Sequence, residues 1–547
     1  MSTHEVINQV PPRSGVDEFE LNTALVDAVA HYDAGWASPQ LHTVGRIVGT
    51  AEFQQDAERA NTLKPVLHTH DRYGHRIDEV EYDPSYHRIL ASAVAHGAHT
   101  SAWAEPRPGA NVARAATFML YAQVEPGHAC PVSMTHAAVP ALETTPELAE
   151  RWLPRLLSRE YDPNLRAGAS WGTASALFGM AMTEKQGGSD VRAGTTRAIR
   201  ATDAGDGSWR LTGHKWFCSA PMSDGFLVLA QAPAGLSCFL VPRVLDDGMR
   251  NVFRIQRLKD KLGNRSNASC EVEFDGTVGY LVGKEGRGVR TIIEMVARTR
   301  LDCILGTAAG MRQAVAEATW HARHRRAFGA ELIDQPVMAS VLADLALESE
   351  AATATGMRLA RAHDADANDQ ERAFRRLATA VSKYWICKRG PEHAYEALEC
   401  LGGNGYIEEF PLARRYREQP VLAIWEGSGN VIALDVLRAL AREPETADAF
   451  DLEVSQAAGA HPVLDAHLTQ TRRLLHEVAQ ADAAGAALAA RRLVEAMALA
   501  LQASLLVRTA PAAVSDAFIQ ARLGLDRGRL YGTLPLGVDT SAILARA

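Results

Sequence analysis

The sequence predicts a mainly α-helical protein with one small β-domain, and three observations support this. Apolar residues recur at helical spacing in two long regions, roughly 22–160 and 288–443. Between them lie short segments rich in β-branched and aromatic residues, such as Phe226–Ala230, with no helical pattern separating them. Such strands favour a small antiparallel barrel or sandwich. Residues 444–547 are rich in Ala and Leu and again favour helices.

These changes in pattern divide the chain into four predicted parts. A chain of 547 residues is too long for one hydrophobic core. We expect an N-terminal helical domain over 1–177, a β-domain over 178–287, a four-helix bundle over 288–443 and a helical extension over 444–547.

Composition narrows the function classes. The net charge is -8 and there is no long basic run, so nothing global indicates nucleic acid or an anionic membrane as a partner. The seven cysteines are scattered, odd in number and without CxxC pairs, which favours reduced thiols over disulfides or a zinc site. The sequence lacks a charged-then-apolar leader and an apolar run of membrane-spanning length. We therefore expect a cytoplasmic protein with no metal and no membrane span.

The segment Ile424–Asn430 (IWEGSGN) places a carboxylate between a tryptophan and a Gly-Ser-Gly run, and a helical pattern follows. The glycines allow a tight turn close to a ligand, and the first amides of the helix favour an anion. Partial desolvation beside Trp425 would raise the pKa of Glu426 toward the range of a general base. On these residues alone, a helix-entry turn with a solvated glutamate explains the pattern equally well.

Four further segments are typical of a flavin or nucleotide site. Gly179–Asp190 offers hydroxyls around a glycine pair, which can surround a planar cofactor. Gly213–Ser219 is an aromatic strand ending in a hydroxyl, Arg325–Gly329 joins a cation to an aromatic ring, and Leu401–Tyr406 adds a glycine turn. Each has an ordinary structural explanation alone, but five segments in order are more specific than any one.

At these segments the sequence resembles the acyl-CoA dehydrogenase flavoprotein family, over roughly residues 50–440. Met182–Val191, Gly213–Phe217, Leu258–Ser269 and Ile424–Asn430 look like its AidB-type branch of alkylation-response flavoproteins. That branch carries an added C-terminal helical DNA-binding domain, and residues after 445 occupy its place. The resemblance implies the family's fold: helical domain, β-domain and helical bundle.

The resemblance also implies a homotetramer that binds FAD. Arg325 and Phe328 would reach the diphosphate and adenine side of FAD, in this family often across a subunit interface. The complete set of implied FAD contacts is Met182, Thr183, Gly188, Ser189, Phe217, Cys218, Ser219, Arg325, Phe328, Ile424, Trp425, Gly427, Ser428, Gly429 and Asn430.

Glu426 matches the family's catalytic base. Some members place the base before an arginine of the first bundle helix, but here Thr299 precedes Arg300, and Asp302 is off the pattern. The sequence departs from the family in placing Glu399 before the glycine turn, where a Gln is usual. In the flavin-flanking strand Phe217 stands where a stacking Trp is usual.

The extension contains ten Arg, no Lys and twelve Asp plus Glu from Arg442 onward, a net charge of -2. From charge alone, a solvated helical face is the simpler interpretation. Arg527, with Arg522 and Arg529 nearby, resembles a DNA-contacting site of the AidB type. The resemblance therefore implies nonspecific binding of double-stranded DNA and a role in the response to DNA alkylation, with weak or residual dehydrogenation of short or branched acyl-CoA. The alternative is a catabolic acyl-CoA dehydrogenase whose extension serves only assembly.

Overall fold

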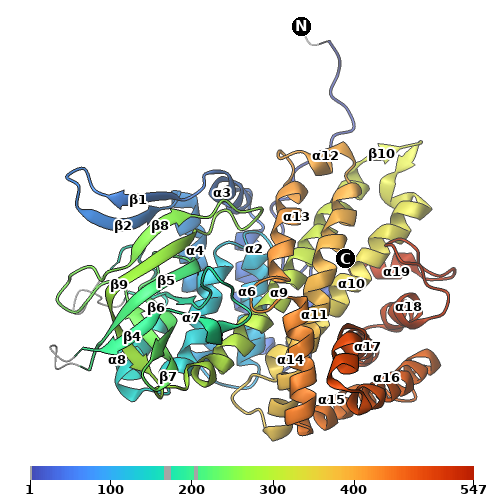
Figure 1. Cartoon of the computed structure of the whole chain (residues 1–547). Coiled ribbons are helices and arrows are strands. Elements are labelled where there is room, and N and C mark those ends of the chain that lie inside the picture. The colour runs from blue at the N-terminus through green and yellow to red at the C-terminus, as the bar shows by residue number, and fades with distance from the viewer. Residues whose placement is uncertain (1–2, 166–173, 202–206) are drawn as a thin grey trace. The chain divides into compact units, whose positions relative to one another are not determined.

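The structure is a computed structural model that describes residues 3–165, 174–201 and 207–547 (Figure 1). The chain forms two compact units, whose limits differ from the four predicted boundaries. Unit 1 comprises 1–54, 106–124 and 300–547, and unit 2 comprises 55–105 and 125–299. The long helix α9 (Gly288–His324) contributes its residues before Arg300 to unit 2 and the remainder to unit 1.

Unit 2 is built on the β-domain that the sequence predicts. Strands β6, β4, β5, β9 and β7 pair in a closed ring, because β7 also pairs with β6. β3 adds to β6 and β8 adds to β9. The strands are β3 (Phe178–Ala181), β4 (Arg197–Arg200), β5 (Trp209–Ser219), β6 (Gly225–Ala232), β7 (Gly235–Pro242), β8 (Arg254–Leu258) and β9 (Ser269–Val282). A small, mostly antiparallel barrel results.

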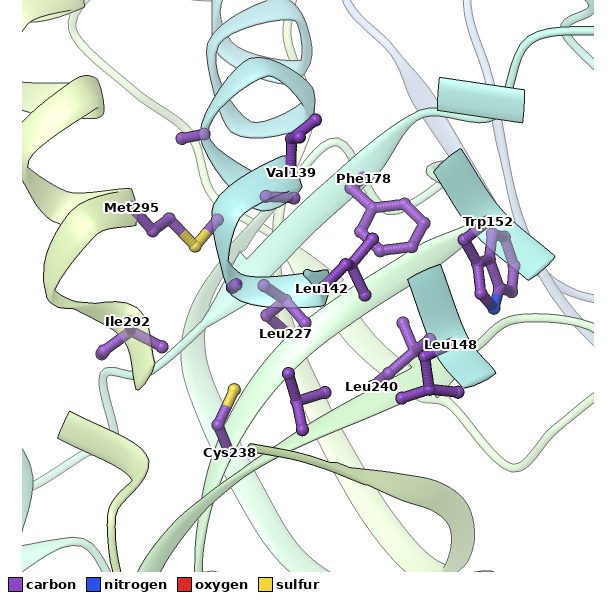
Figure 2. Packing of buried hydrophobic residues seen from close by; sticks show 14 of the residues in the cluster. Val139, Leu142, Leu148, Trp152, Phe178, Leu227, Cys238, Leu240, Ile292 and Met295 are labelled. Carbon is purple, nitrogen blue, oxygen red and sulfur yellow. The ribbon is translucent and has the colours of Figure 1, made fainter. Parts of the chain in front are cut away.

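Helices of unit 2 cover one face of this barrel and share its core. Figure 2 shows Val139 of α7 and Trp152 of α8 packed with Phe178, Leu227 and strand β7. Trp152 meets the Phe178 ring edge-on at 5.1 Å between ring centroids. Unit 2 contains α4 (Pro84–Ala95), α5 (Ser101–Ala104), α7 (Ala129–Leu142) and α8 (Pro146–Leu156), and α3 (Ala51–Thr62) crosses its boundary. This shared core fixes the strands that carry the first group of site residues.

The N-terminal region is not wholly helical as predicted. A hairpin of β1 (Val66–His70) and β2 (Arg76–Glu81) interrupts the helices. Asp71 sets its turn, since one carboxylate oxygen accepts the amides of Tyr73 and His75 at 2.8 and 2.9 Å. The short alternation of polar and apolar residues around Asp71–Gly74 was the available signal.

Unit 1 is a helical assembly around the predicted bundle. Its bundle helices are the later part of α9, α10 (Pro336–Arg361), α11 (Asp369–Glu399), α13 (Pro411–Leu422) and α14 (Gly429–Arg442), with the short α12 (Gly403–Tyr406). Three N-terminal helices belong to the same unit: α1 (Thr23–His31), α2 (Ser38–Val48) and α6 (Ala110–Ala122).

The C-terminal extension belongs to the same compact unit as the bundle (Figure 1). Buried charges join the two: Arg358 of α10 pairs with Glu453 at 2.7 Å, and Arg508 reaches the same carboxylate at 2.6 Å. Trp385 Nε1 donates to Gln502 Oε1 at 3.0 Å. The extension helices are α15 (Glu445–Ser455), α16 (Pro462–Gln480), α17 (Ala483–Thr509), α18 (Ala512–Leu523) and α19 (Thr540–Leu544). Among the described helices, none is long and apolar enough to cross a membrane.

Candidate active site

In unit 2, strand β5 presents an aromatic ring on its outer surface. A β-bulge between Lys215 and Cys218 breaks the alternation of side chains, so both Trp216 and Phe217 lie outside the barrel. Lys259 covers Trp216, with Nζ 3.2 Å from the ring centroid. The Phe217 ring stays about half exposed, at 51%. Phe217 is therefore the ring of this pair most available to a ligand.

The loop after β3 is tied to β5 by a buried ion pair. Lys215 Nζ lies 2.9 Å from Glu184, whose carboxylate also accepts the amides of Thr195 and Thr196 at 2.6 and 3.1 Å. Burial opposes the charged form, but the Thr195 amide and Lys215 together hold the pKa of Glu184 well below its usual range. This carboxylate fixes the direction in which residues 183–189 leave the barrel.

That loop carries two hydroxyl groups, and its backbone at Gly188 lies close to the first of them. A side chain at Gly188 would place its Cβ 2.5 Å from Thr183 Oγ1, so the glycine permits the close approach. Ser189 is exposed and Thr183 is half-buried. Among the described residues, no hydrogen bond occupies the side-chain hydroxyl of either.

Ser219 at the end of β5 is ordered by the segment Leu258–Ser269. Its Oγ lies 2.9 Å from Ser269 Oγ, which accepts a hydrogen bond from Lys261 Nζ at 3.0 Å. The same Lys261 ammonium donates to Asn267 O at 2.5 Å. This chain of hydrogen bonds fixes the Ser219 hydroxyl beside the exposed Phe217.

Two of the implied FAD contacts in unit 2 have side chains that are partly or fully buried. Met182 packs against the hydrophobic core of Figure 2. Cys218 is fully buried and lies directly opposite Cys270 of β9. Only the backbone of Cys218 therefore remains available to a cofactor, whereas the Met182 side chain is partly buried and keeps some exposed surface.

In unit 1, Glu426 lies on a turn with an unusual backbone. Its φ is +58° and that of Gly427 is +113°. A non-glycine residue in the left-handed region costs roughly 1–2 kcal/mol, so the surrounding structure must hold it there. Gly427 cannot easily be replaced, since its Cβ would lie 2.8 Å from Ile432 Cδ1. The turn presents a half-buried carboxylate on a strained backbone, as functional sites often do.

Cationic side chains of two bundle helices hold this turn. Arg300 of α9 donates from Nε to the backbone oxygen of Glu426 at 3.1 Å, and Asp435 holds the same guanidinium at 2.6 Å. Lys383 of α11 donates to the backbone oxygens of Trp425 and Gly427. Sequence reasoning did not identify Lys383, because nothing local to its helix indicates a long-range partner.

Trp425 and Ile424 divide the turn into a buried and an exposed side. Trp425 packs against Cys303, Cys387 and Leu422, and Ile424 is 64% exposed. Trp425 Nε1 is buried, and it has no hydrogen-bond partner among the described residues. The partly buried indole therefore helps to anchor the turn in the bundle.

The start of α14 follows the turn at once. Ser428 is its N-cap residue, and a side chain at Gly429 would place Cβ 2.5 Å from Lys388 Cε. Asn430, which we expected to close over the cofactor, accepts hydrogen bonds from Arg491 Nε and Nη2 at 2.9 and 2.6 Å. The first turn of α14 is thus joined to helix α17 of the extension.

The two alternative positions for a base do not offer a suitable group. Thr299 is buried, and its hydroxyl donates to the backbone oxygens of Met295 and Val296 at 3.3 and 3.2 Å. Asp302 is buried in a two-point ion pair with Arg114, one of whose contacts is 2.9 Å. A carboxylate held in this way is committed to structure, so Glu426 stays the best-placed base in its unit.

Arg325 and Phe328 lie on a small hairpin of β10 (Arg326–Ala327) and β11 (Ala330–Glu331). Phe328 and Gly329 form its two-residue turn, both with positive φ, and the Phe328 ring is fully exposed. Asn8 holds the hairpin through reciprocal 2.9 Å hydrogen bonds with the backbone of Arg326. The exposed ring is free for the cofactor contact that the sequence predicts, and single exposed apolar residues are also common on protein surfaces.

The three arginines of the predicted DNA site have different environments. Arg527 and Arg529 are exposed on the loop after α18. Arg522 is largely buried and pairs with Asp344 at 2.6 Å and Glu348 at 3.0 Å, both on α10. Its guanidinium is neutralised inside the protein, so Arg522 is unsuited to the DNA contact that we predicted.

Comparison with known proteins shows which family this chain resembles over most of its length. Residues 8–163 match the family described as adaptive response protein AidB N-terminal domain. Residues 179–277 and 286–441 match the acyl-CoA dehydrogenase middle and C-terminal domains. The chain is 47% identical over 480 residues to "Putative acyl-CoA dehydrogenase AidB" of Escherichia coli strain K12, covering 87% of this chain and 88% of that protein. This chain belongs to the AidB-like branch of the acyl-CoA dehydrogenase family.

Solved structures agree with this assignment. Caenorhabditis elegans ACDH-11 in complex with C11-CoA superposes with a TM-score of 0.85 at 24% identity, covering 95% of this chain and 93% of that one. The apo-form of Bd2924 gives 0.84 at 27% identity and covers 92% and 100%. An acyl-CoA dehydrogenase complexed with FAD from Bacillus anthracis gives 0.65 at 17% identity, covering 80% and 79%. The first and third comparisons show the shared fold alone.

The chain therefore belongs to a family of flavin-dependent oxidoreductases. The described residues of unit 2 suit an isoalloxazine ring. Phe217 offers an exposed aromatic face, and the hydroxyls of Thr183 and Ser189 offer unoccupied donors around a glycine that admits close approach. Both kinds of contact are what a planar ring with a polar edge requires.

Proposed function

We propose that this protein oxidises the acyl chain of a short or branched coenzyme A thioester, and that Glu426 is the base. The observation that carries the proposal is the turn at 424–428, where Glu426 has a left-handed backbone conformation. Arg300 and Lys383 stabilise this turn by donating hydrogen bonds to the backbone oxygens of three successive residues, Trp425 to Gly427. Such strain persists only where the surroundings enforce it, and it gathers at functional sites.

In the proposed reaction Glu426 takes the proton from the α-carbon of the thioester. Bound FAD would supply the acceptor for the hydride of the β-carbon, so the acyl chain would lose two hydrogens in total, one as a proton and one as a hydride. A carboxylate performs this step when it is deprotonated and directed at the α-carbon. We propose that Thr183, Ser189, Phe217 and Ser219 contact the flavin ring. Arg325 and Phe328 would contact the diphosphate and adenine side, in the partner subunit of a homotetramer.

The test is flavin reduction by candidate thioesters. The purified protein should carry FAD, and its visible absorbance should bleach when a suitable thioester is added without an electron acceptor. Glu426→Gln should bind FAD normally and bleach at least about 1000-fold more slowly, since the base is absent. Equal bleaching by Glu426→Gln would assign the base to another residue.

We further propose that the extension binds double-stranded DNA without sequence preference, through Arg527 and Arg529, in a response to DNA alkylation. The exposure of both arginines supports this, as does the 47% identity to the E. coli protein AidB. Binding would be directed at phosphates and therefore salt-dependent. Fast catalytic turnover together with no affinity for DNA would favour instead a catabolic dehydrogenase whose extension serves assembly.

A further inference from the structure

Lys383 contacts the turn on both sides of Glu426. Its side chain is 1% exposed, and Nζ donates to Trp425 O at 2.9 Å and to Gly427 O at 2.5 Å. Because the two acceptors flank Glu426, one ammonium group bridges that residue. With Arg300 on the oxygen of Glu426 itself, three successive carbonyl groups are held by cations.

A buried ammonium group is costly unless it is paired or fully hydrogen-bonded. Among the described residues Lys383 forms no ion pair, and its Nζ donates to the two backbone oxygens of the turn. Burial raises the pKa of the Cys303 thiol, and the charges of Lys383 and Glu426 act on that thiol in opposite directions. Both charged groups therefore lie close to the same buried sulfur.

The hydrogen bonds of Lys383 fix a geometry that the sequence of the turn does not favour. Glu426 has φ +58°, a conformation that glycine or asparagine adopts more readily. Rotation of Glu426 back to an ordinary conformation would turn the two peptide planes that flank it. Lys383 holds the oxygen of the first, Trp425 O, and Arg300 holds the oxygen of the second, Glu426 O, while Lys383 also holds the next oxygen along the chain, Gly427 O. The direction of the carboxylate therefore depends on this ammonium group.

We propose that Lys383 is a positioning residue, which holds Glu426 in the left-handed conformation that directs its carboxylate at the substrate. The inference rests on the proposed role of Glu426 as base. Lys383 acts through the backbone of the turn and does not touch the thioester. A misdirected base removes the proton slowly even when substrate and cofactor bind normally.

The experiment compares Lys383→Met with Trp385→Phe in the FAD-loaded full-length protein. Methionine keeps most of the length of the lysine side chain and removes its donors. Trp385→Phe removes one hydrogen bond of the same helix, to Gln502, at a residue remote from the turn's contacts. Two quantities are measured: hydrogen exchange of the backbone amides in 423–430, and the rate and concentration dependence of flavin reduction by the thioester that bleaches the parent.

For Lys383→Met we expect amide exchange in 423–430 to become at least about tenfold faster, while Trp385→Phe stays near the parent. We expect the limiting rate of flavin reduction to fall about 100-fold, with half-saturation by the thioester changed less than about twofold. Unchanged exchange, or losses equal to those of Trp385→Phe, would overturn the inference.

The exchange measurement also separates this inference from the proposed function. If no thioester bleaches the parent flavin, the proposed reaction fails, and faster exchange in Lys383→Met alone still supports the positioning of the turn. If the parent bleaches and Lys383→Met bleaches as fast, the reaction stands and the role of Lys383 is wrong.

Discussion

A nitrogen of the Arg522 guanidinium group lies 2.6 Å from a carboxylate oxygen of Asp344, within the protein. The same group lies 3.0 Å from Glu348, so one arginine of α18 is shared by two carboxylates of α10. Asp344 also accepts the amide of Gly532 at 2.9 Å. The pair therefore joins the end of the extension to the bundle, which is a structural task.

Arg522→Ala should destabilise the protein by about 3–5 kcal/mol, because it leaves the buried carboxylate of Asp344 without its cation, while Glu348 keeps Arg389 at 3.1 Å. Arg527→Ala should change stability by less than about 0.5 kcal/mol, since that residue is exposed. Chemical unfolding followed by circular dichroism measures both. Similar stabilities for the two variants would contradict the buried position of Arg522.

The DNA proposal predicts a change in salt dependence. Arg527→Ala and Arg529→Ala should each weaken binding of duplexes of any sequence and lower the slope of log affinity against log salt by about 1. Arg473→Ala is the matched control, because it removes one exposed positive charge of the extension that is paired with Glu477 at 3.1 Å. Fluorescence anisotropy at several salt concentrations gives the slopes. Equal slopes for all three variants would remove the loop after α18 from the DNA site.

The folded protein should become less stable as the pH is lowered, because it contains the fully buried His393. Burial lowers the pKa of His393 to about 4, whereas an unfolded histidine titrates near 6.5. The unfolded state alone binds this proton between those values, so the histidine's contribution is full above pH 6.5 and is lost as pH falls toward 4. The resulting loss in the free energy of unfolding is about 3 kcal/mol, because each unit of pKa shift corresponds to about 1.4 kcal/mol. His393→Gln should lose correspondingly less stability than the parent between pH 7 and 4.5, measured by denaturant midpoints.

Much of the architecture was predictable from the sequence. Phe226–Ala230 lies within β6 as predicted, because a short continuous apolar run bounded by turn residues is typical of a buried strand. The small β8 and the β1–β2 hairpin were missed, since a short strand beside a longer one depends on its partner more than on its own residues. The fold class and the family are confirmed by the comparisons.

The site was less accessible to sequence reasoning. Local patterns located Glu426 and Phe217 but could not show that Cys218 faces the barrel interior or that Arg522 is neutralised. Both outcomes depend on residues far away in the sequence: Cys270 for the first and Asp344 for the second. Lys383 was missed for the same reason. The role of Glu426 as the base stays a prediction.

Comparing Gly427→Ala with a second glycine variant separates two effects: the loss of stability caused by a positive φ, and the displacement of the turn that carries Glu426. Gly427 has φ +113°, and an added Cβ would lie 2.8 Å from Ile432 Cδ1, so alanine must displace the turn. The matched control is Gly459→Ala, which has φ +82° and nothing within 4 Å of the added Cβ. Both variants should lose about 1–2 kcal/mol of stability through the positive φ, but only Gly427→Ala should slow flavin reduction, by about 100-fold. Unfolding curves and anaerobic bleaching measure the two effects. Equal bleaching rates in the two variants would show that the conformation of residues 424–428 does not govern the reaction, and would remove the structural reason for assigning Glu426 as the base.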